Sequence, residues 1–298
     1  MDQQTQDTHP SSELTLVLGA TGKTGSRIVT SLRERGVPVR EGSRSAMPAF
    51  DWNVEAGWDA VLGGVEAMYI NYSPDLAIPG ATESIRNLVK AAERHGVKRA
   101  VILSGRGEAE AQACEAIVMD SAMESTVVRA SWFNQNFSEG AFIEMVHAGV
   151  IALPESRVLE PWVDVDDIAD VAVAALTGNG HAGEIYEVTG PRLLSLNDVA
   201  EELSSATGRE IRYVPIGHRD FVEGVAASGA PEDVVWIMDY LFSTVLDGRN
   251  AHVCDGVQRA LGRAPRDFGA YARDVAATGV WELSESADER AALPAEPA

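Results

Sequence analysis

The chain has 298 residues, with 45 acidic against 24 basic side chains and a formal net charge of −21; a chain this acidic repels nucleic-acid backbones and anionic membrane surfaces. Its length suffices for one large or two modest domains whose core needs no disulfide or metal. Cys114 and Cys254 lie far apart and are expected to be free thiols, and a polar start without membrane-length apolar runs predicts a soluble, cytoplasmic protein.

Strand-like and helix-like segments alternate between two polar tails, at residues 1–12 and 284–298. Short apolar runs bounded by glycine or serine are typical of buried strands, and apolar spacings of three and four indicate helices. The alternation predicts an α/β fold with a doubly wound parallel sheet, followed from about residue 217 by a small, mostly helical C-terminal lobe. In chain order, strands are expected at 14–20, 37–43, 67–71, 99–105, 125–131 and 184–190, and helices at 23–36, 81–96, 110–123, 164–177 and 195–208.

The stretch GATGKTG, from Gly19 to Gly25, joins the first strand to the first helix. A nucleoside-triphosphate loop would need a glycine at position 17, but Val17 lies there, inside the strand. The spacing of Gly19, Gly22 and Gly25 instead matches a dinucleotide-binding turn, whose glycines allow the tight turn, the approach of a pyrophosphate and the packing of helix on strand. The pyrophosphate would rest on the N-terminus of the helix that begins near Lys23.

The tip of the second strand reads EGSRS and bears on the choice of dinucleotide. A carboxylate at this place binds the ribose 2′-hydroxyl of NAD, whereas an arginine accommodates the 2′-phosphate of NADP. Ser43 and Arg44 favour NADP(H). Glu41 is close enough to serve NAD(H) instead, and Arg44 could also be an ordinary solvated charge.

The segment SGRGE, residues 104–108, follows a predicted strand, and ligands of parallel sheets bind beyond the strand ends. Arg106 and Glu108 could orient a substrate or relay a proton, or they could form an ion pair on the surface. A hydrolase elbow is excluded because Ile102 stands where Gly-x-Ser-x-Gly needs glycine. Tyr72 also follows a strand and could act as a weak acid or serve structure alone.

The segment SWFNQNF, residues 131–137, follows the next strand along the chain. Trp132, Phe133 and Asn136 could line a substrate pocket. In the alternative interpretation the aromatic side chains are plain packing, and Asn134 and Asn136 cap a helix.

Nothing in the sequence indicates a metal site. No two of the six histidines have ligand spacing, and the motif His-Glu-x-x-His does not occur. The acidic run Asp164–Asp167 is better explained by capping and by the dipole at the start of a helix.

In their order along the chain, these motifs resemble those of the NmrA-like atypical short-chain dehydrogenase/reductases. The resemblance spans about residues 13–215, and the pattern is most similar to the agroclavine dehydrogenase-like and quinone- or dye-reducing branch. The motifs that carry it are LGATGKTGSR (18–27), GSRS (42–45), FDW (50–52), GVKRAVILSG (96–105), TVVRASWFNQNFSE (126–139), PWVDVDDIADVAVAALT (161–177) and GEIYEVTGP (183–191).

The resemblance implies an extended Rossmann domain over residues 13–155 that binds NADP(H), followed over 156–283 by the remaining sheet elements and a substrate lobe. It places Asp51 and Trp52 near the adenine, Asn71–Pro74 along the ribose side, and Ser104–Gly105 and Ala130–Phe133 near the nicotinamide. The expected cofactor contacts are Gly19, Thr21, Gly22, Lys23, Thr24, Gly25, Ser43, Arg44, Asp51, Trp52, Asn71, Tyr72, Ser104 and Gly105; the expected substrate contacts are Tyr72, Arg106, Trp132, Phe133 and Asn136.

One departure from the better-known short-chain dehydrogenases shapes the expected chemistry. Those enzymes use a serine with Tyr-x-x-x-Lys, in which the tyrosine protonates a carbonyl and the lysine lowers the tyrosine pKa. Here the lysines are Lys23, Lys90 and Lys98, so none follows the strand that ends near Ser104. We therefore expect hydride transfer that needs little proton donation, to or from an iminium, quinone, enone or cationic dye. Tyr72, Ser104 and Glu108 are the candidates for a catalytic role.

Two other functions fit the same residues. A cofactor-sensing regulator would bind the dinucleotide and a protein partner without turnover, as some NmrA-like proteins do. An isomerase or cyclase on the same fold would keep the cofactor as a vestige. The leading expectation is an oxidoreductase that acts on a small molecule, with neither nucleic acid nor membrane as partner.

Overall fold

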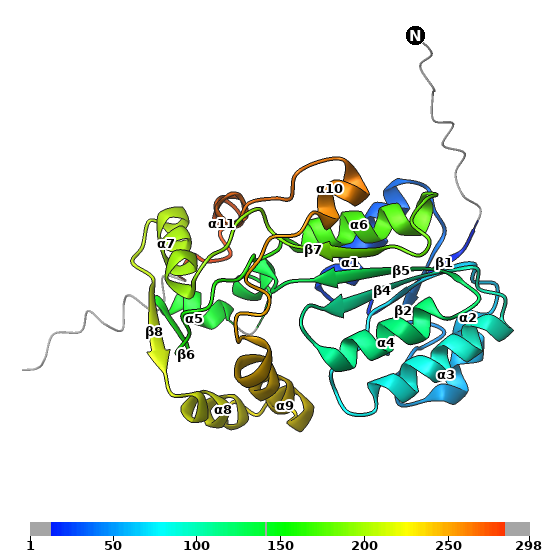
Figure 1. Cartoon of the computed structure of the whole chain (residues 1–298), viewed down its shortest axis with the longest axis horizontal. Helices are drawn as coiled ribbons and strands as arrows, with labels where there is room; N and C mark the ends of the chain where they lie inside the picture. The colour runs from blue at the N-terminus through cyan, green and yellow to red at the C-terminus, as the bar shows by residue number, and fades with distance from the viewer. Residues whose placement is uncertain (1–12, 141, 284–298) are drawn as a thin grey trace, which may run out of the picture.

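The structure is a computed structural model that describes residues 13–140 and 142–283. The polar tails expected at 1–12 and 284–298 lie outside these described residues. Figure 1 shows two lobes side by side, a larger one built on a sheet and a smaller one that holds most of the C-terminal helices.

The larger lobe is built on a six-stranded sheet with the strand order β2-β1-β3-β4-β5-β7. Every neighbouring pair of strands is parallel, which confirms the predicted doubly wound α/β fold. The strands are β1 (Thr15–Leu18), β2 (Val39–Gly42), β3 (Ala67–Ile70), β4 (Arg99–Gly105), β5 (Glu124–Ala130) and β7 (Ile185–Val188).

Helices cover both faces of this sheet, as Figure 1 shows. Side chains of one strand point alternately to the two faces: Leu16 and Leu18 pack into one apolar core, and Val17 packs into the other. A continuous apolar run is therefore the pattern that a strand covered on both sides requires. One layer holds α1 (Lys23–Glu34), α6 (Val165–Thr177) and α10 (Gly256–Leu261), and the other holds η1 (Glu55–Gly57), α2 (Trp58–Leu62), α3 (Ala81–Arg94) and α4 (Ala109–Met119).

Two helices begin where the sequence predicted. The Asp164 carboxylate accepts a hydrogen bond from the backbone amide of Asp166 at the start of α6. Ser195 and Asp198 form a reciprocal capping box at the start of α7. Both caps satisfy amides that the first helical turn leaves unpaired.

The smaller lobe contains a second sheet that the sequence analysis missed, in which β6 (Val150–Pro154) pairs in parallel with β8 (Arg212–Ile216). Each strand is five residues long and contains a proline, so neither gives a clear strand signal. The helical character expected from about residue 217 is confirmed, and an aromatic core that includes Phe137, Trp162 and Phe268 fills the lobe. The helices of this lobe are η2 (Asn134–Phe137), α5 (Ile143–His147), α7 (Leu196–Thr207), α8 (His218–Ala227), α9 (Glu232–Tyr240), η3 (Leu241–Val245) and α11 (Phe268–Ala276).

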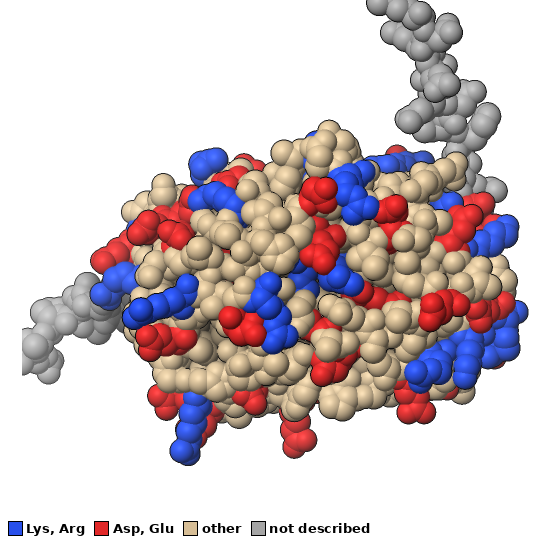
Figure 2. All heavy atoms as spheres, viewed as in Figure 1, with Lys and Arg blue, Asp and Glu red and all other residues tan. Residues whose placement is uncertain are grey.

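The surface in Figure 2 carries acidic and basic side chains interspersed with uncharged ones, without a continuous basic patch on the face shown. Among the described helices, none has both the length and the apolar composition that crossing a lipid bilayer would require.

Candidate functional site

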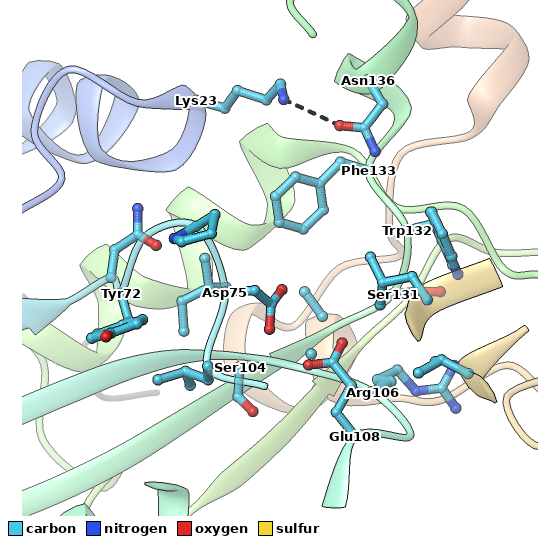
Figure 3. Close-up of a pocket in the computed structure, with 18 of the residues that line it drawn as sticks. Lys23, Tyr72, Asp75, Ser104, Arg106, Glu108, Ser131, Trp132, Phe133 and Asn136 are labelled. Atoms are coloured by element: carbon cyan, nitrogen blue, oxygen red, sulfur yellow. Dashed lines mark hydrogen bonds between the residues drawn. The ribbon is translucent and has the colours of Figure 1, made fainter. Parts of the chain in front are cut away.

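A cavity of about 300 Å³ opens between the two lobes. Its walls come from the carboxyl ends of β3, β4 and β5 on one side and from α9 and η3 on the other (Figure 3). Ligands of parallel sheets bind at this end of the strands. The residues expected from sequence that line it are Lys23, Asn71, Tyr72, Ser104, Gly105, Arg106, Glu108, Trp132, Phe133 and Asn136. The other expected residues, Gly19, Thr21, Gly22, Thr24, Gly25, Ser43, Arg44, Asp51 and Trp52, lie outside the cavity wall.

The glycine-rich turn between β1 and α1 has the geometry of a close-approach site. Gly19 has a φ of +69°, which favours glycine. A β-carbon on Gly25 would lie 2.1 Å from the carbonyl oxygen of Gly19, so the packing of α1 on β1 requires glycine there. Gly22 is the N-cap residue of α1, and no side chain of the described chain caps this helix start. The first turn of α1 is therefore open to an anion.

The turn also lies at the point where the strand order reverses, because β1 has β2 on one side and β3 on the other. Gly19 follows β1 and Asn71 follows β3, and a β-carbon on Gly19 would lie 2.7 Å from Nδ2 of Asn71. Such a switch point is where doubly wound sheets bind ligands. Thr21 is exposed in the turn, whereas the buried Thr24 hydroxyl accepts a hydrogen bond from Tyr69 Oη at 3.0 Å. The Thr24 side chain thus faces the core.

The charged side chains near the tip of β2 differ in their partners. Glu41 pairs with Arg33 of α1 at 2.6 Å, and Arg40 donates to two backbone carbonyl oxygens. Arg44 is exposed, and no hydrogen bond or ion pair engages its side chain within residues 13–140 and 142–283. Ser43 is half-buried beside it. Arg44 is therefore the charge at this tip that remains available to an anionic ligand.

The segment after β2 contributes an aromatic wall next to the residues that follow β3. The rings of Trp52 and Tyr72 lie with their centroids 4.7 Å apart. Trp58 Nε1 donates a hydrogen bond to the backbone oxygen of Asp51 at 2.9 Å, which fixes this segment against α2. Tyr72 lines the cavity, and Trp52, which contacts it, does not.

Lys23 reaches from the start of α1 across the cavity. Its Nζ donates to Oδ1 of Asn136 at 3.1 Å, the contact drawn in Figure 3. Burial lowers the pKa of Lys23, against an opposing effect of Glu139. The cavity thus contains one lysine, supplied by the glycine turn and bonded to an asparagine rather than to a tyrosine.

The alternative interpretation, in which Asn134 and Asn136 cap a helix, is wrong. Phe133 is the N-cap residue of η2, and within the described segments no side chain caps this helix. Asn134 is fully buried, and its side-chain amide has no hydrogen-bond partner among the described residues. Asn136 instead lines the cavity and binds Lys23.

Arg106 and Glu108 do not form the surface ion pair that the sequence left open as an alternative, because both are buried, each 4% exposed. The Arg106 guanidinium pairs with Glu187 of β7 at 3.2 Å and donates to the backbone oxygen of Asn250. This arginine therefore fastens the loop of residues 247–254 to the end of the sheet. Glu108 points into the cavity instead (Figure 3).

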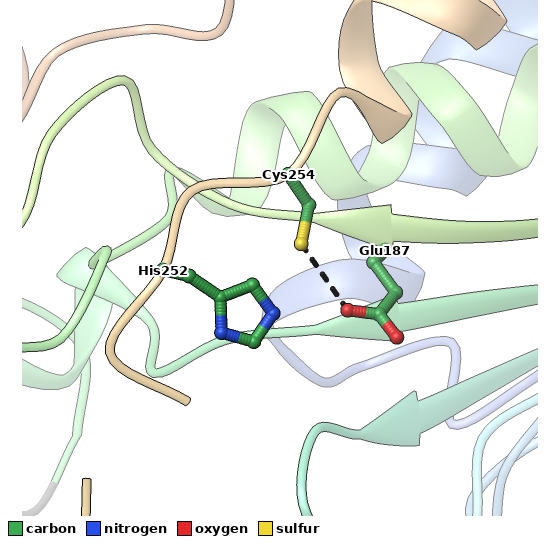
Figure 4. Close-up of side chains that lie close together, drawn as sticks. All are labelled: Glu187, His252 and Cys254. Atoms are coloured by element: carbon green, nitrogen blue, oxygen red, sulfur yellow. Dashed lines mark hydrogen bonds between the residues drawn. The ribbon is translucent and has the colours of Figure 1, made fainter. Parts of the chain in front are cut away.

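The same arginine contacts a cluster formed by Glu187, His252 and Cys254, which Figure 4 shows. One carboxylate oxygen of Glu187, one ring nitrogen of His252 and Sγ of Cys254 lie within 4.8 Å of one another. Arg106 donates to Cys254 Sγ at 3.3 Å and lies 2.9 Å from His252 Nε2. Burial and the hydrogen bond to Glu187 raise the pKa of Cys254 to about 11, so the sulfur is a thiol. A guanidinium already supplies the positive charge that a metal ion would bring, and no metal is needed to explain the cluster.

Sequence reasoning missed several cavity residues. Asp75 lies directly after the expected segment Asn71–Pro74, and burial raises its pKa. Its position beyond a strand end was the available signal. Ser131 also lines the cavity, next to the expected Trp132. No sequence signal singled out the cavity residues that come from α9, η3 and the loop after them, which are Met238, Leu241, Val245 and Asn250.

Comparisons with known proteins agree with this geometry. A scan against models of protein families finds no match. The NAD(P)H azoreductase of Xenophilus azovorans is 32% identical over 283 residues, which cover 88% of this chain and 98% of that protein. The agroclavine dehydrogenase of Claviceps fusiformis is 29% identical over 279 residues, covering 87% of this chain and 96% of that protein.

Two solved structures share the fold at low sequence identity. The triphenylmethane reductase of Citrobacter sp., complexed with NADP(H), has a TM-score of 0.71 at 18% identity, covering 88% of this chain and 100% of that chain. NmrA, a negative transcriptional regulator in complex with NAD, has a TM-score of 0.64 at 19% identity, covering 92% and 100%. With the azoreductase as a full-length relative, the chain belongs to the NmrA-like atypical short-chain dehydrogenase/reductases, a family that includes NAD(P)H-dependent oxidoreductases.

Proposed function

We propose that this protein is an NADPH-dependent reductase of small conjugated or cationic organic molecules. The observation that carries the proposal is the uncapped glycine turn at the reversal point of the sheet, which lies next to a cavity walled by the ends of β3, β4 and β5. The turn suits a diphosphate, and the cavity lies in the direction in which the rest of a dinucleotide would extend.

The residues present fit NADP(H). The first turn of α1, with Gly22 and the amides of Lys23 and Thr24, would hold the diphosphate, and Arg44 with Ser43 would hold the 2′-phosphate. Asp51 and Trp52 would flank the adenine, Asn71 and Tyr72 would flank a ribose, and Ser104 and Gly105 would lie near the nicotinamide. When bound, the reduced cofactor supplies a hydride to the substrate.

The walls of the cavity favour flat, conjugated substrates. Tyr72, Trp132, Phe133 and Phe142 contribute aromatic faces, and Met238 adds an adaptable apolar contact from the smaller lobe. The azoreductase, agroclavine dehydrogenase and triphenylmethane reductase named above are similar to this chain and are named for compounds of several kinds. We infer from these names only that the acceptor of this protein is a conjugated or cationic organic molecule.

The lack of a Tyr-x-x-x-Lys pair supports the same substrate class. No lysine follows Lys98 in the sequence, and Lys23, which does reach the cavity, is hydrogen-bonded to Asn136. A simple ketone would need a proton on its oxygen as hydride arrives. Iminium ions and cationic dyes become neutral when they accept a hydride, and quinones and enones spread the negative charge that they gain, so all of them accept a hydride more readily than a simple ketone does.

A titration of the protein with NADPH and with NADH, followed by a panel of acceptors, tests the proposal. We expect tighter binding of NADPH and oxidation of NADPH by iminium, quinone, enone or dye acceptors. Turnover confined to simple ketones would contradict the substrate class. Binding without oxidation by any acceptor would indicate a cofactor-sensing regulator, and a lack of binding would favour an isomerase or cyclase.

A further inference from the structure

Two carboxyl groups from different loops meet in the cavity. Asp75 comes from the loop after β3 and Glu108 from the N-cap position of α4, and Figure 3 shows their carboxyl groups pointing toward one another. Glu108 is 4% exposed, and its Oε2 is buried without a hydrogen-bond partner in the described chain. The hydroxyl oxygens of Ser104 and Ser131, in the same wall, are also buried and unpartnered among the described residues. Unsatisfied buried polar atoms of this kind indicate a place for a polar ligand.

The backbone holds Glu108 in this inward position. Gly107 has a φ of +80°, which lets the chain turn back on itself after β4. A β-carbon on Gly105 would lie 2.0 Å from Oε1 of Glu108. The carboxyl group therefore occupies the space that a side chain at position 105 would fill, and the two glycines of SGRGE serve its placement.

The hydrogen-bond partners of the two acids differ, and this difference decides which one holds a proton. Oδ1 of Asp75 accepts a hydrogen bond from the backbone amide of Ala77 at 2.8 Å, which favours a carboxylate. Oε2 of Glu108 is buried and accepts no hydrogen bond from any described residue, and the side-chain partner of the Glu108 carboxyl group is Asp75 itself. Burial, followed by the charge of Asp75, raises the pKa of Glu108 far above its usual range. Glu108 is therefore the protonated member of the pair.

The charges around the pair reinforce this assignment. Glu110 and Glu115 of α4 add negative charge near Glu108 and raise its pKa further. The guanidinium of Arg106 is turned away toward Glu187. Other charged or titratable groups near the pair include Cys114 of α4, Tyr240 of α9, and Arg249, which donates to the backbone oxygen of Gly107; Lys23 and Tyr72 line the same cavity.

We propose that Glu108, holding its proton against Asp75, is the catalytic proton donor of this cavity for neutral conjugated acceptors such as quinones, enones and azo compounds. The proposal rests on the proposed NADPH-dependent reduction. A neutral acceptor that has gained a hydride carries a negative charge and a lone pair on oxygen or nitrogen. The O–H bond of Glu108 breaks, its electron pair stays on the carboxylate, and a new O–H or N–H bond forms on the acceptor. Water then restores the proton to Glu108, so that one hydride and one proton are consumed in each turnover.

The role divides acceptors into two classes. A cationic acceptor, such as an iminium ion or a triphenylmethane dye, becomes neutral when it gains a hydride and needs no proton. A neutral acceptor needs one. Glu108 is thus expected to matter for the second class alone, and for that class a buried carboxylic acid takes the place of the Tyr-x-x-x-Lys pair that this chain lacks.

The variants Glu108→Gln and Asp75→Asn test the proposal, with Glu83→Gln, an exposed position in the first turn of α3, as the matched control. For Glu108→Gln we expect about 100-fold lower kcat/KM with neutral acceptors, the usual order of a lost general acid, and little change with a cationic dye. Fluorescence titration should give unchanged NADPH affinity for every variant. An unchanged ratio of neutral to cationic turnover in Glu108→Gln would overturn the proposal, as would a wild-type protein that reduces the dye and no neutral acceptor.

A second measurement uses the protein without cofactor. Burial raises the pKa of Glu160 to about 7, so this carboxyl group also contributes a band at neutral pH, and difference spectra in the infrared are needed to remove it. The spectrum of the wild type minus that of Glu108→Gln should show the carbonyl band of a protonated carboxylic acid, and the spectrum of the wild type minus that of Glu83→Gln should not. Asp75→Asn removes the neighbouring charge, so this band and the activity with neutral acceptors should both disappear at a lower pH than in the wild type. A missing wild-type band overturns the proposal even if NADPH binds. A wild type that binds no NADPH overturns the proposed function, and the band then still reports whether Glu108 holds the proton.

Discussion

Glu41 at the end of β2 is paired with Arg33 of α1, with 2.6 Å between the carboxylate and the guanidinium. The sequence left open whether this glutamate binds a ribose 2′-hydroxyl or whether Arg44 binds a 2′-phosphate. Because Glu41 is engaged and the Arg44 side chain has no partner among the described residues, the balance of available charge at the tip of β2 is positive. This arrangement favours NADPH over NADH.

Arg44→Ala is expected to weaken NADPH binding about 10- to 100-fold, the range for a lost hydrogen bond to a charged group of about 1.5–3 kcal/mol. NADH binding should stay the same, because NADH carries no 2′-phosphate. Isothermal titration calorimetry with both cofactors measures this, with Arg35→Ala, an exposed residue at the other end of α1, as the control. An equal loss of affinity for NADPH and NADH would contradict the proposed contact between Arg44 and the 2′-phosphate.

Arg33→Ala should have the opposite consequence for specificity. Removing the arginine frees the Glu41 carboxylate, so we expect NADH to bind several-fold more tightly relative to NADPH. The stability of the protein should change by less than about 1 kcal/mol, because exposed ion pairs contribute little. Calorimetry gives the affinities for the two cofactors, and thermal melting of the same preparation gives the change in stability. An unaltered ratio of NADH affinity to NADPH affinity would mean that Glu41 does not face the cofactor.

Gly25→Ala is expected to destabilise the fold by about 1–3 kcal/mol, the usual cost of overpacking, and to weaken NADPH binding. Its β-carbon would lie 2.1 Å from the carbonyl oxygen of Gly19, so α1 would have to move away from β1. Gly224→Ala in α8 is the matched control, because nothing lies within 4 Å of its β-carbon and the change should stabilise the helix by up to about 1 kcal/mol. Urea unfolding of the two variants should give shifts of opposite sign.

The raised pKa of Glu108 predicts a specific dependence of stability on pH. In the unfolded chain a glutamate loses its proton near pH 4.3, whereas in the folded protein Glu108 keeps it. The folded state therefore binds more protons above that pH, and the free energy of unfolding falls as pH rises, by at most about 1.4 kcal/mol per pH unit from this group. In Glu108→Gln this part of the slope should vanish. The free energy of unfolding of the wild type and of Glu108→Gln is measured at a series of pH values from 5 upward, roughly in single-unit steps. Parallel curves of free energy against pH for the two proteins would contradict the raised pKa of Glu108.

The cluster around Arg106 should behave as an ion-pair anchor and not as a metal site. Arg106→Met is expected to cost about 3 kcal/mol, since it leaves buried polar partners unsatisfied, although Glu187 keeps its second partner Arg129 at 2.8 Å. Arg219→Met, which removes an exposed pair with Glu223, should cost less than about 1 kcal/mol. Dialysis of the wild type against a chelator should leave its melting temperature unchanged; a clear fall would indicate a bound metal.

The sequence by itself determined the sheet of the larger lobe and the place of the glycine-rich turn. Apolar runs such as Leu14–Leu18 and the spaced glycines from Gly19 to Gly25 act over short distances in the chain, so their meaning does not depend on distant partners. The same is true of the caps at Asp164 and Ser195. The short strands β6 and β8 were not predicted, because their hydrophobic pattern is weak and the two strands, which pair with each other, lie far apart in the sequence.

Only the tertiary structure decided which side chains meet. Because the sequence has no tyrosine–lysine pair, hydride transfer with little proton donation was expected, and Glu108 was one of three candidates for a catalytic role. The parallel pairing of β3 with β4 is what brings the loops of Asp75 and Glu108 together. The same holds for Arg106 with Glu187. Burial and neighbouring charge set the protonation and the availability of each group, and both arise from the packing of elements that are distant in the chain.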